Sequence, residues 1–279
     1  MRNHPHMRKV NDWQLVVLSS FTMLALLHVI NKINIDLISD HSIIFGDIAV
    51  GTIALLLTRK YCNTQFFYLR LPANLNRFLL ASLFVFALYY LNGGTQNFHI
   101  GSASKIFWGT LSVLAIGFGE ELFGRLFIAG ILQKYGLLYS AFYSSLCFAL
   151  MHLSNFGNGQ SFGGTSIQVI NAFGWGFLAF AIVKYTDSII PVILFHALLD
   201  SPMFLTAHTH HHASGGSVIL GILFTVLTST LCVVAGIWML SKTPDWLLKE
   251  ESEFRLGKHL EPLLVKLGLI EKDEFDDIN

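Results

Sequence analysis

The stretch Gly117-Phe-Gly-Glu-Glu-Leu-Phe-Gly-Arg125 decides the fold, because it places two carboxylates and a guanidinium inside an apolar run. Its flanks, 107–119 and 126–132, are largely apolar. Even the low estimates put the cost of one charged residue at the centre of a membrane helix at about 2.5–3.5 kcal/mol. Charged residues that are kept at such a cost indicate a functional site. The stretch therefore predicts a membrane helix that carries chemistry.

The composition is that of a membrane protein. The chain has 279 residues, of which 53% are hydrophobic and 13% charged, and its mean hydropathy is +0.57. A soluble domain carries about 25% charged residues. The formal net charge is zero, so the basic footprint of a nucleic-acid-binding protein is missing. We therefore predict an all-α, polytopic membrane protein with the lipid bilayer as its surroundings and no nucleic-acid partner.

Eight apolar runs divide the chain, and several of them are a little short of the roughly 20 residues that cross a bilayer. They predict about eight transmembrane helices, at 13–30, 43–58, 78–91, 107–132, 140–156, 167–183, 189–206 and 218–240. The chain then divides into four parts. They are N-terminal transmembrane helices (1–104), a core that holds the charged stretch (105–205), a last transmembrane helix (206–242) and a charged tail (243–279).

The distribution of Lys and Arg predicts the orientation. These residues gather in the N-terminus, in the segment after the second run and in the tail, which all lie on one side if eight helices cross. The other side has only Lys32 and Lys105. Because cytoplasmic loops carry the excess of Lys and Arg, both termini are predicted to be cytoplasmic in a protein of the cell membrane. The tail has leucines at near-helical spacing, which predicts an amphipathic helix on the membrane surface.

Helix geometry gives the charged residues different roles. Glu121 and Arg125 are four residues apart, so they share a face and can form an internal ion pair that braces the helix. Glu120 points about 100° away, on the face of Gly117 and Gly124, where small residues leave room for a neighbouring helix or a cavity. We interpret Glu120 as the free carboxylate of a site. The alternative is that all three charged residues form one structural network.

Two histidines, His152 and His196, lie close to the predicted depth of Glu120, and Asp200 lies a helical turn closer to the outer side. His152 follows the run that begins at residue 140, and His196 and Asp200 share a face four residues apart. A carboxylate and a histidine can activate water as a general base, and a second histidine can stabilise an oxyanion. Two histidines with carboxylates also suit zinc, which would supply the nucleophile itself. Both routes predict hydrolysis of an amide within the membrane.

Gly174-Trp-Gly176 is interpreted as a helix-packing motif.

These residues resemble the signature motifs of the CAAX prenyl protease type 2 family, also called the CPBP or abortive-infection family of intramembrane proteases. The resemblance covers about 105–205. It implies an all-helical fold of about eight transmembrane helices around a cavity. It also implies that Glu120 and His152 activate water and that His196 and the residue at 200 stabilise the oxyanion. The motifs are Glu120-Glu121-x-x-x-Arg125, Phe148-x-x-x-His152 and His196-x-x-x-Asp200.

Asp200 departs from the family pattern, which usually has Asn at this position. An amide can donate a hydrogen bond to an oxyanion, whereas an ionised carboxylate can only accept one. Asp200 must therefore be protonated, bind a metal or orient His196. A Zn²⁺ ion held by Glu120, His152, His196 and Asp200 thus stays open as an alternative to a glutamate mechanism, with Glu121, Arg125 and Phe148 supporting the site.

The sequence thus predicts an intramembrane endopeptidase that acts on a peptide or a membrane-anchored protein. The resemblance implies CAAX-type processing, peptide maturation or bacteriocin self-immunity as its task. The first alternative is a scaffold or immunity protein of the same fold that has no protease activity. The second is a proton-coupled transporter, since intramembrane Glu, His and Asp can relay protons. No internal repeat of the kind found in transporters favours this second alternative.

Overall fold

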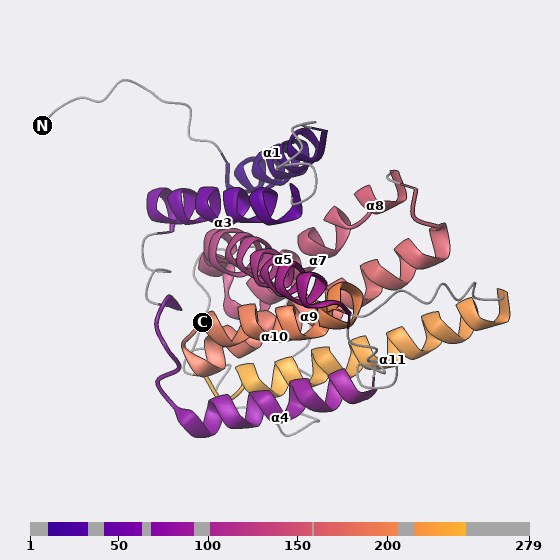
Figure 1. The fold of residues 1–279 in the computed structure, drawn as a ribbon. Coiled ribbons are helices and arrows are strands. Elements are labelled where there is room, and N and C mark those ends of the chain that lie inside the picture. Colours follow the sequence, from indigo (N-terminus) through magenta and orange to yellow (C-terminus); the bar gives the residue numbers. More distant parts are fainter. Residues whose placement is uncertain are drawn as a thin grey trace, which may run out of the picture.

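The computed structural model describes residues 11–32, 42–62, 68–91, 101–157, 159–205 and 215–243, and the regular elements within them are all helices (Figure 1). Each predicted run overlaps one helix or several consecutive helices, and the all-α prediction is confirmed. The elements are α1 (Asp12–Lys32), α3 (Ser42–Tyr61), α4 (Leu75–Leu91), α5 (Ala103–Glu121), the π-helix η2 (Leu122–Ile128), α6 (Ala129–Leu132), the 3₁₀-helix η3 (Gln133–Tyr135), α7 (Leu137–Met151), α8 (Ser154–Gly157), α9 (Phe162–Thr186), α10 (Ile190–Leu205) and α11 (Gly215–Leu240).

Within the described ranges, four helical segments are long and apolar enough to cross a membrane. They are Ser42–Tyr61, Leu137–Gly157, Phe162–Thr186 and Ile219–Leu240. The apolar helices at Asp12–Leu27, Leu75–Leu91 and Ile190–Leu205 are shorter. The protein is therefore membrane-embedded, while the crossing of all eight runs stays a prediction. The predicted tail lies outside the described residues from 244 onward.

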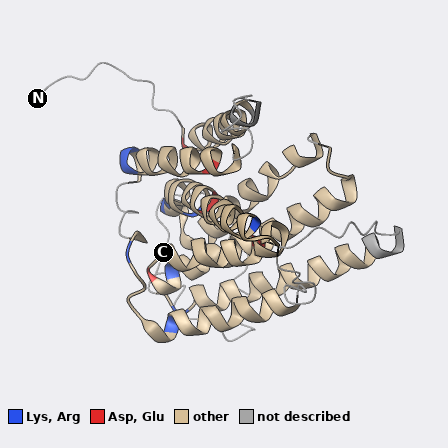
Figure 2. Ribbon diagram, viewed as in Figure 1, with Lys and Arg blue, Asp and Glu red and all other residues tan. Residues whose placement is uncertain are grey.

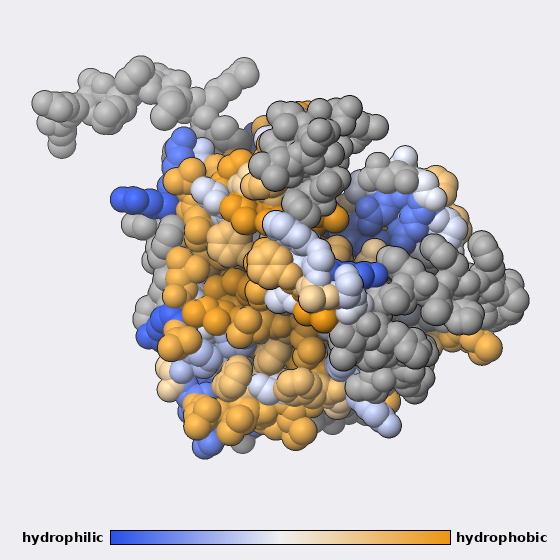
Figure 3. Space-filling model, in the orientation of Figure 1, coloured by the Kyte–Doolittle hydropathy of each residue, from blue (hydrophilic) through white to orange (hydrophobic). Residues whose placement is uncertain are grey.

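Apolar side chains cover most of the described surface on the face drawn in Figure 3. Leu83 of α4 and Leu220 of α11 each expose 68% of their surface, and Phe21 of α1 exposes the same fraction. Contiguous apolar surface of this kind marks contact with a membrane or a partner rather than with water. It agrees with helices that face lipid.

Helix α9 is the most buried of the long helices because its residues are apolar on all sides rather than along one stripe. It packs against α7 and α11. A Cβ built on Gly174 would lie 2.6 Å from Cα of Ser229 in α11, and one on Gly176 would lie 3.1 Å from Cβ of Ser145 in α7. The glycines of the Gly174-Trp-Gly176 motif thus pack as the sequence interpretation expects.

Helix α5 packs between α3 and α10 through two further glycines. A Cβ on Gly117 would lie 2.6 Å from the carbonyl oxygen of Ile193 in α10, and a Cβ on Gly119 would lie 2.5 Å from the carbonyl oxygen of Asp47 in α3. Real Cβ atoms do not approach backbone so closely. These two positions therefore let three helices meet just before the carboxylate pair.

One end of the helix bundle collects Lys and Arg. Figure 2 shows most of the blue segments at helix ends on the left of the view, including the last turns of α3 and α9. Lys184 donates hydrogen bonds to the Tyr68 hydroxyl at 2.9 Å and to Gln133 Oε1 at 2.6 Å. Burial raises the pKa of Tyr68 to about 12, so its hydroxyl stays neutral. Nearby in sequence, Lys134 lies 2.5 Å from Asp12 at the start of α1. The predicted cytoplasmic ends therefore lie together, and the side of the membrane stays a prediction.

Candidate active site

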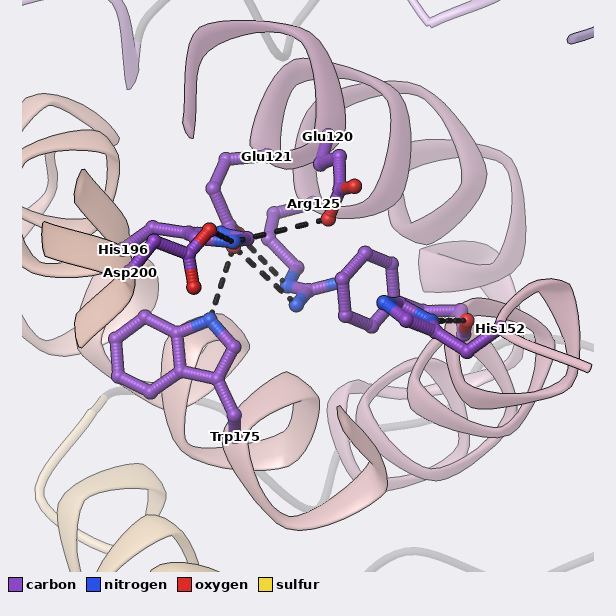
Figure 4. Close-up of polar contacts among 8 residues, drawn as sticks. Glu120, Glu121, Arg125, His152, Trp175, His196 and Asp200 are labelled. Atoms are coloured by element: carbon purple, nitrogen blue, oxygen red, sulfur yellow. Dashed lines mark hydrogen bonds and ion pairs between the residues drawn. The ribbon is translucent and has the colours of Figure 1, made fainter. Parts of the chain in front are cut away.

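Glu121 joins three helices at the centre of the site (Figure 4). Its side chain is fully buried, and its Oε2 lies 3.0 Å from Nε of Arg125. This is the ion pair that the four-residue spacing predicts. Oε1 accepts a hydrogen bond from Nε1 of Trp175 in α9 at 3.0 Å and lies 2.6 Å from Nδ1 of His196 in α10. Glu121 therefore holds a histidine of the site as well as bracing its own helix.

The chain continues from Glu121 as the π-helix η2, in which all seven residues are buried. The amide of Ala129 donates to the carbonyl oxygen of Gly124, five residues back. Single turns of π-helix are rare and occur frequently at functional sites. Arg125 lies in this turn with 1% of its surface exposed, and its guanidinium carbon is 4.2 Å from the ring centroid of Phe148. Phe148 thus covers the arginine that neutralises Glu121, which fits the supporting role expected for it.

His196 is the residue on which the acidic groups converge. Its Nε2 lies 3.7 Å from Oε2 of Glu120 and 3.5 Å from Oδ2 of Asp200. Its Nδ1 contacts Glu121, and an ionised carboxylate can only accept, so Nδ1 carries the hydrogen of this contact. Nε2 is then the ring nitrogen that faces the other two carboxylates. The structure brings Glu120, His196 and Asp200 together, as their matched depths predict.

His152 lies apart from this group. It follows the last residue of α7, and its Nδ1 is 3.0 Å from the carbonyl oxygen of Phe148. In Figure 4 it stands on the opposite side of the site from Asp200. Among the described residues, no hydrogen bond or ion pair joins His152 to Glu120. The two residues expected to activate water together are therefore separated, and any joint action needs a bridging molecule.

Two cavities adjoin His152, and Glu120 lines the first of them. The first has a volume of about 160 Å³ and the second about 200 Å³. A cavity needs about 10–15 Å³ of this volume to hold one water, so each has room for several. Polar residues line both cavities, and Phe148, His152 and Gln168 belong to both. The first also has Asp47, Glu120, Ser154 and Asn155; the second also has Asn171, Trp175, His196, Asp200 and Thr228.

The four residues proposed as zinc ligands do not fit a zinc ion as they are placed. Zinc takes three or four protein ligands at one point. In the part of the chain that the structure describes, no group of three His, Cys, Asp or Glu side chains is arranged to hold a metal ion. Nδ1 of His196 is engaged by Glu121, and Nδ1 of His152 by a backbone carbonyl. We therefore derive no catalytic step through a metal.

The sequence reasoning missed two residues of the site. Asp47 lines the first cavity from α3 with 6% of its surface exposed. The sequence already marks Asp47 as a candidate site residue, because it is an acidic residue inside a predicted membrane run. Trp175 was interpreted only as packing, although a buried indole N–H usually needs an acceptor. Both residues reach the site from helices that are distant in the sequence from the charged stretch.

Comparison with known proteins agrees with the motif resemblance. Residues 102–202 match the family model described as type II CAAX prenyl endopeptidase Rce1-like. The matched region holds Glu120, Glu121, Arg125, His152, His196 and Asp200, and it excludes Asp47. No curated protein and no solved structure matches the chain.

Proposed function

We propose that this chain, whose residues 102–202 are assigned to the Rce1-like type II CAAX prenyl endopeptidases, hydrolyses a peptide bond of a membrane-associated peptide or protein within the membrane. The observation that carries the proposal is the convergence of Glu120, Glu121 and Asp200 on the imidazole of His196 beside two cavities. The family match supports the reaction class, and this geometry supports the roles of the residues.

Water is activated in the first cavity, where Glu120 and His152 face a space large enough for it. Glu120 accepts a proton as the water oxygen forms its bond to the peptide carbonyl carbon. The bond between this carbon and the leaving nitrogen then breaks, and the proton passes to that nitrogen. His152 lines the same cavity and holds the water by a further hydrogen bond, which it donates to the water oxygen. The lack of a direct contact between the two side chains is what such a bridging water requires.

The oxyanion forms beside His196. In its doubly protonated form the ring donates from Nδ1 to Glu121 and from Nε2 to the negative oxygen. Glu121 fixes the orientation of the ring, and Arg125 keeps this carboxylate in place. Ionised Asp200 cannot donate to an oxyanion. Its Oδ2 lies 3.5 Å from Nε2, so we assign it the task of orienting His196.

The test is cleavage of a quenched fluorescent peptide library by the purified protein in detergent, with prenylated and unprenylated members and with and without a chelator. We expect wild-type activity that Glu120→Gln and His196→Gln each lower by about 10²-fold or more, the range for loss of a general base and of one oxyanion-stabilising donor. Trp238→Phe is the matched control, because Trp238 is 38% exposed on α11 and lines neither cavity.

Two outcomes would contradict the proposal. Chelator-sensitive wild-type activity would replace the glutamate mechanism with metal chemistry. Wild-type protein as inactive as both variants, together with Glu120→Gln still working in cells, would establish the alternative of a scaffold without protease activity.

A further inference from the structure

Asp47 carries a buried carboxylate to which the mechanism proposed above assigns no role. It lies in α3, an apolar helix whose basic residues, Arg59 and Lys60, are confined to the last turn. Only 6% of its surface is exposed. Among the described residues, its carboxylate has no hydrogen bond and no ion pair, and the charged groups that act on it across the site are His196 and Asp200. An acidic group without a partner inside a membrane helix is costly and indicates a functional role.

The carboxylate of Asp47 lies against the residue next to Glu120. A Cβ built on Gly119 would be 2.9 Å from Oδ1 of Asp47. Any side chain at position 119 would therefore displace Asp47 or push α3 away from α5. Glycine at this position lets the acidic residue of one helix reach the carboxylate pair of the other. The contact between α3 and α5 along this segment is extensive (Figure 1).

Asp47 opens into the same cavity as Glu120 and His152. The cavity volume of about 160 Å³ is sufficient for several waters. A water molecule has two hydrogens to donate, and an ionised carboxylate is an acceptor. A general base that takes one hydrogen fixes the water along one direction only. A second acceptor on another helix fixes the direction in which the lone pair of the water points.

We propose that Asp47 is a second water-binding carboxylate of the active site, which accepts one hydrogen bond of the attacking water while Glu120 takes its other proton. The inference rests on the proposed peptidase function and adds a catalytic residue to it. The proton that leaves the water goes to Glu120 and then to the leaving nitrogen, and Asp47 takes no proton in this step. Asp47 lies outside the matched region 102–202, so this part of the site is supplied by the N-terminal helices.

The first test is the kinetics of Asp47→Asn, which keeps the shape of the side chain and removes the charge. We expect kcat to fall about 10²-fold, the order seen when one preorganised polar group of an active site is removed. We expect KM to stay unchanged, because His196 and Asp200 line the other cavity. The matched control is Thr58→Val in the same helix. Thr58 is fully buried, lines neither cavity, and its hydroxyl has no hydrogen-bond partner among the described residues.

The second test needs no peptidase activity. Two carboxylates in one cavity repel each other strongly where the dielectric constant is low. Asp47→Asn should therefore raise the thermal unfolding temperature in detergent by several degrees, and this gain should disappear in a Glu120→Gln background. A double-mutant cycle measures this coupling directly. A carboxylate that only supports the α3–α5 contact would instead lower the unfolding temperature by the same amount in both backgrounds.

The outcomes separate the two proposals. Wild-type kcat in Asp47→Asn, or an equal loss of stability in both backgrounds, overturns the role of Asp47 and leaves the peptidase proposal standing. If wild-type protein cleaves no peptide, the peptidase proposal fails. The role of Asp47 toward the attacking water then fails with it, and the stability coupling decides only whether the two carboxylates interact.

Discussion

Arg125 compensates the negative charge that Glu121 brings into the membrane-embedded site. Its side chain is buried between the Glu121 carboxylate at 3.0 Å and the Phe148 ring at 4.2 Å. The ion pair compensates a carboxylate charge that would otherwise be buried without a counter-charge, and the aromatic face adds a cation–π contact. Because the same carboxylate contacts His196, we expect loss of the arginine to affect both the stability of the protein and the position of His196.

We expect Arg125→Met to lower the free energy of unfolding by about 3–5 kcal/mol, the range for removing one partner of a buried ion pair. Thermal unfolding of the purified protein in detergent measures this. The double variant Arg125→Met with Glu121→Gln removes both charges and should lose much less, because no uncompensated carboxylate remains buried. An equal loss in the single and double variants would mean that the pair does not act as a unit.

Trp175→Phe removes one hydrogen-bond donor and keeps an aromatic ring. Glu121 would lose the bond from Nε1 at 3.0 Å, which should destabilise the protein by about 1–3 kcal/mol, the cost of a buried acceptor left without its donor. Because Glu121 also orients His196, we expect kcat to fall while KM changes little. Steady-state kinetics alongside the Trp238→Phe control tests this. A change in KM alone would place Trp175 in substrate binding instead.

The sequence predicts contacts within one helix better than contacts between helices. The Glu121–Arg125 pair follows from a spacing of four residues, and the structure has it. The contacts of Glu121 with Trp175 and His196 span 54 and 75 residues. They depend on how each helix is rotated about its axis, and periodicity does not determine that rotation when a helix is apolar on all sides. The separation of His152 from Glu120 was missed for the same reason.

At the scale of elements, the apolar runs predict helices because the backbone in lipid must satisfy its own hydrogen bonds. The π-helix η2 is different. It adds one residue to a turn without changing the apolar composition of the run, so the sequence does not predict the π-helix. The small residues of α5 gave a partial sign, since Gly117 was expected to leave room for a neighbouring helix and does so for α10.

Gly117→Ala decides between two opposing effects. Alanine in a helix is favoured over glycine by about 0.5–1 kcal/mol, but its Cβ would lie 2.6 Å from a backbone oxygen of α10, and overpacking costs about 1–3 kcal/mol. Backbone cannot rotate away, so we expect net destabilisation and lower activity, because α10 carries His196. Gly157→Ala is the control, since no atom lies within 4 Å of its added Cβ. Unfolding temperatures that rise in both variants would show that α5 and α10 separate easily.

At the scale of the whole molecule, polar contacts gather the predicted cytoplasmic ends of several helices. Tyr135 donates a hydrogen bond to Asp12 at 2.5 Å, which connects η3 to the start of α1. Lys184 connects the end of α9 to the segment before α4 through Tyr68. One end of the bundle is thus held by polar side chains, and this arrangement is compatible with the orientation that Lys and Arg predict.

We expect a green fluorescent protein fused after Asn279 to fluoresce and an alkaline phosphatase inserted within 206–214 to be active, because the first folds in the cytoplasm and the second only outside it. Fusions at 133–136 supply the internal comparison for the cytoplasmic side. A fluorescent insertion at 206–214, or an inactive fluorescent protein at the C-terminus, would reverse the predicted orientation or change the number of crossings.

The ring of Phe148 and the side chains of His152 and Gln168 belong to two cavities at once, and this has a consequence for inhibition. In the proposed mechanism, a small polar compound that fills the cavity beside Asp47 and Glu120 would take the place of the attacking water and leave the cavity beside Asn171 and Asp200 open to the proposed peptide substrate. It would lower the maximal rate without competing with substrate. A peptide mimic in the other chamber would compete. Two compounds of these kinds would bind one molecule together, and their combined effect in a dose matrix would exceed that of two drugs that exclude each other.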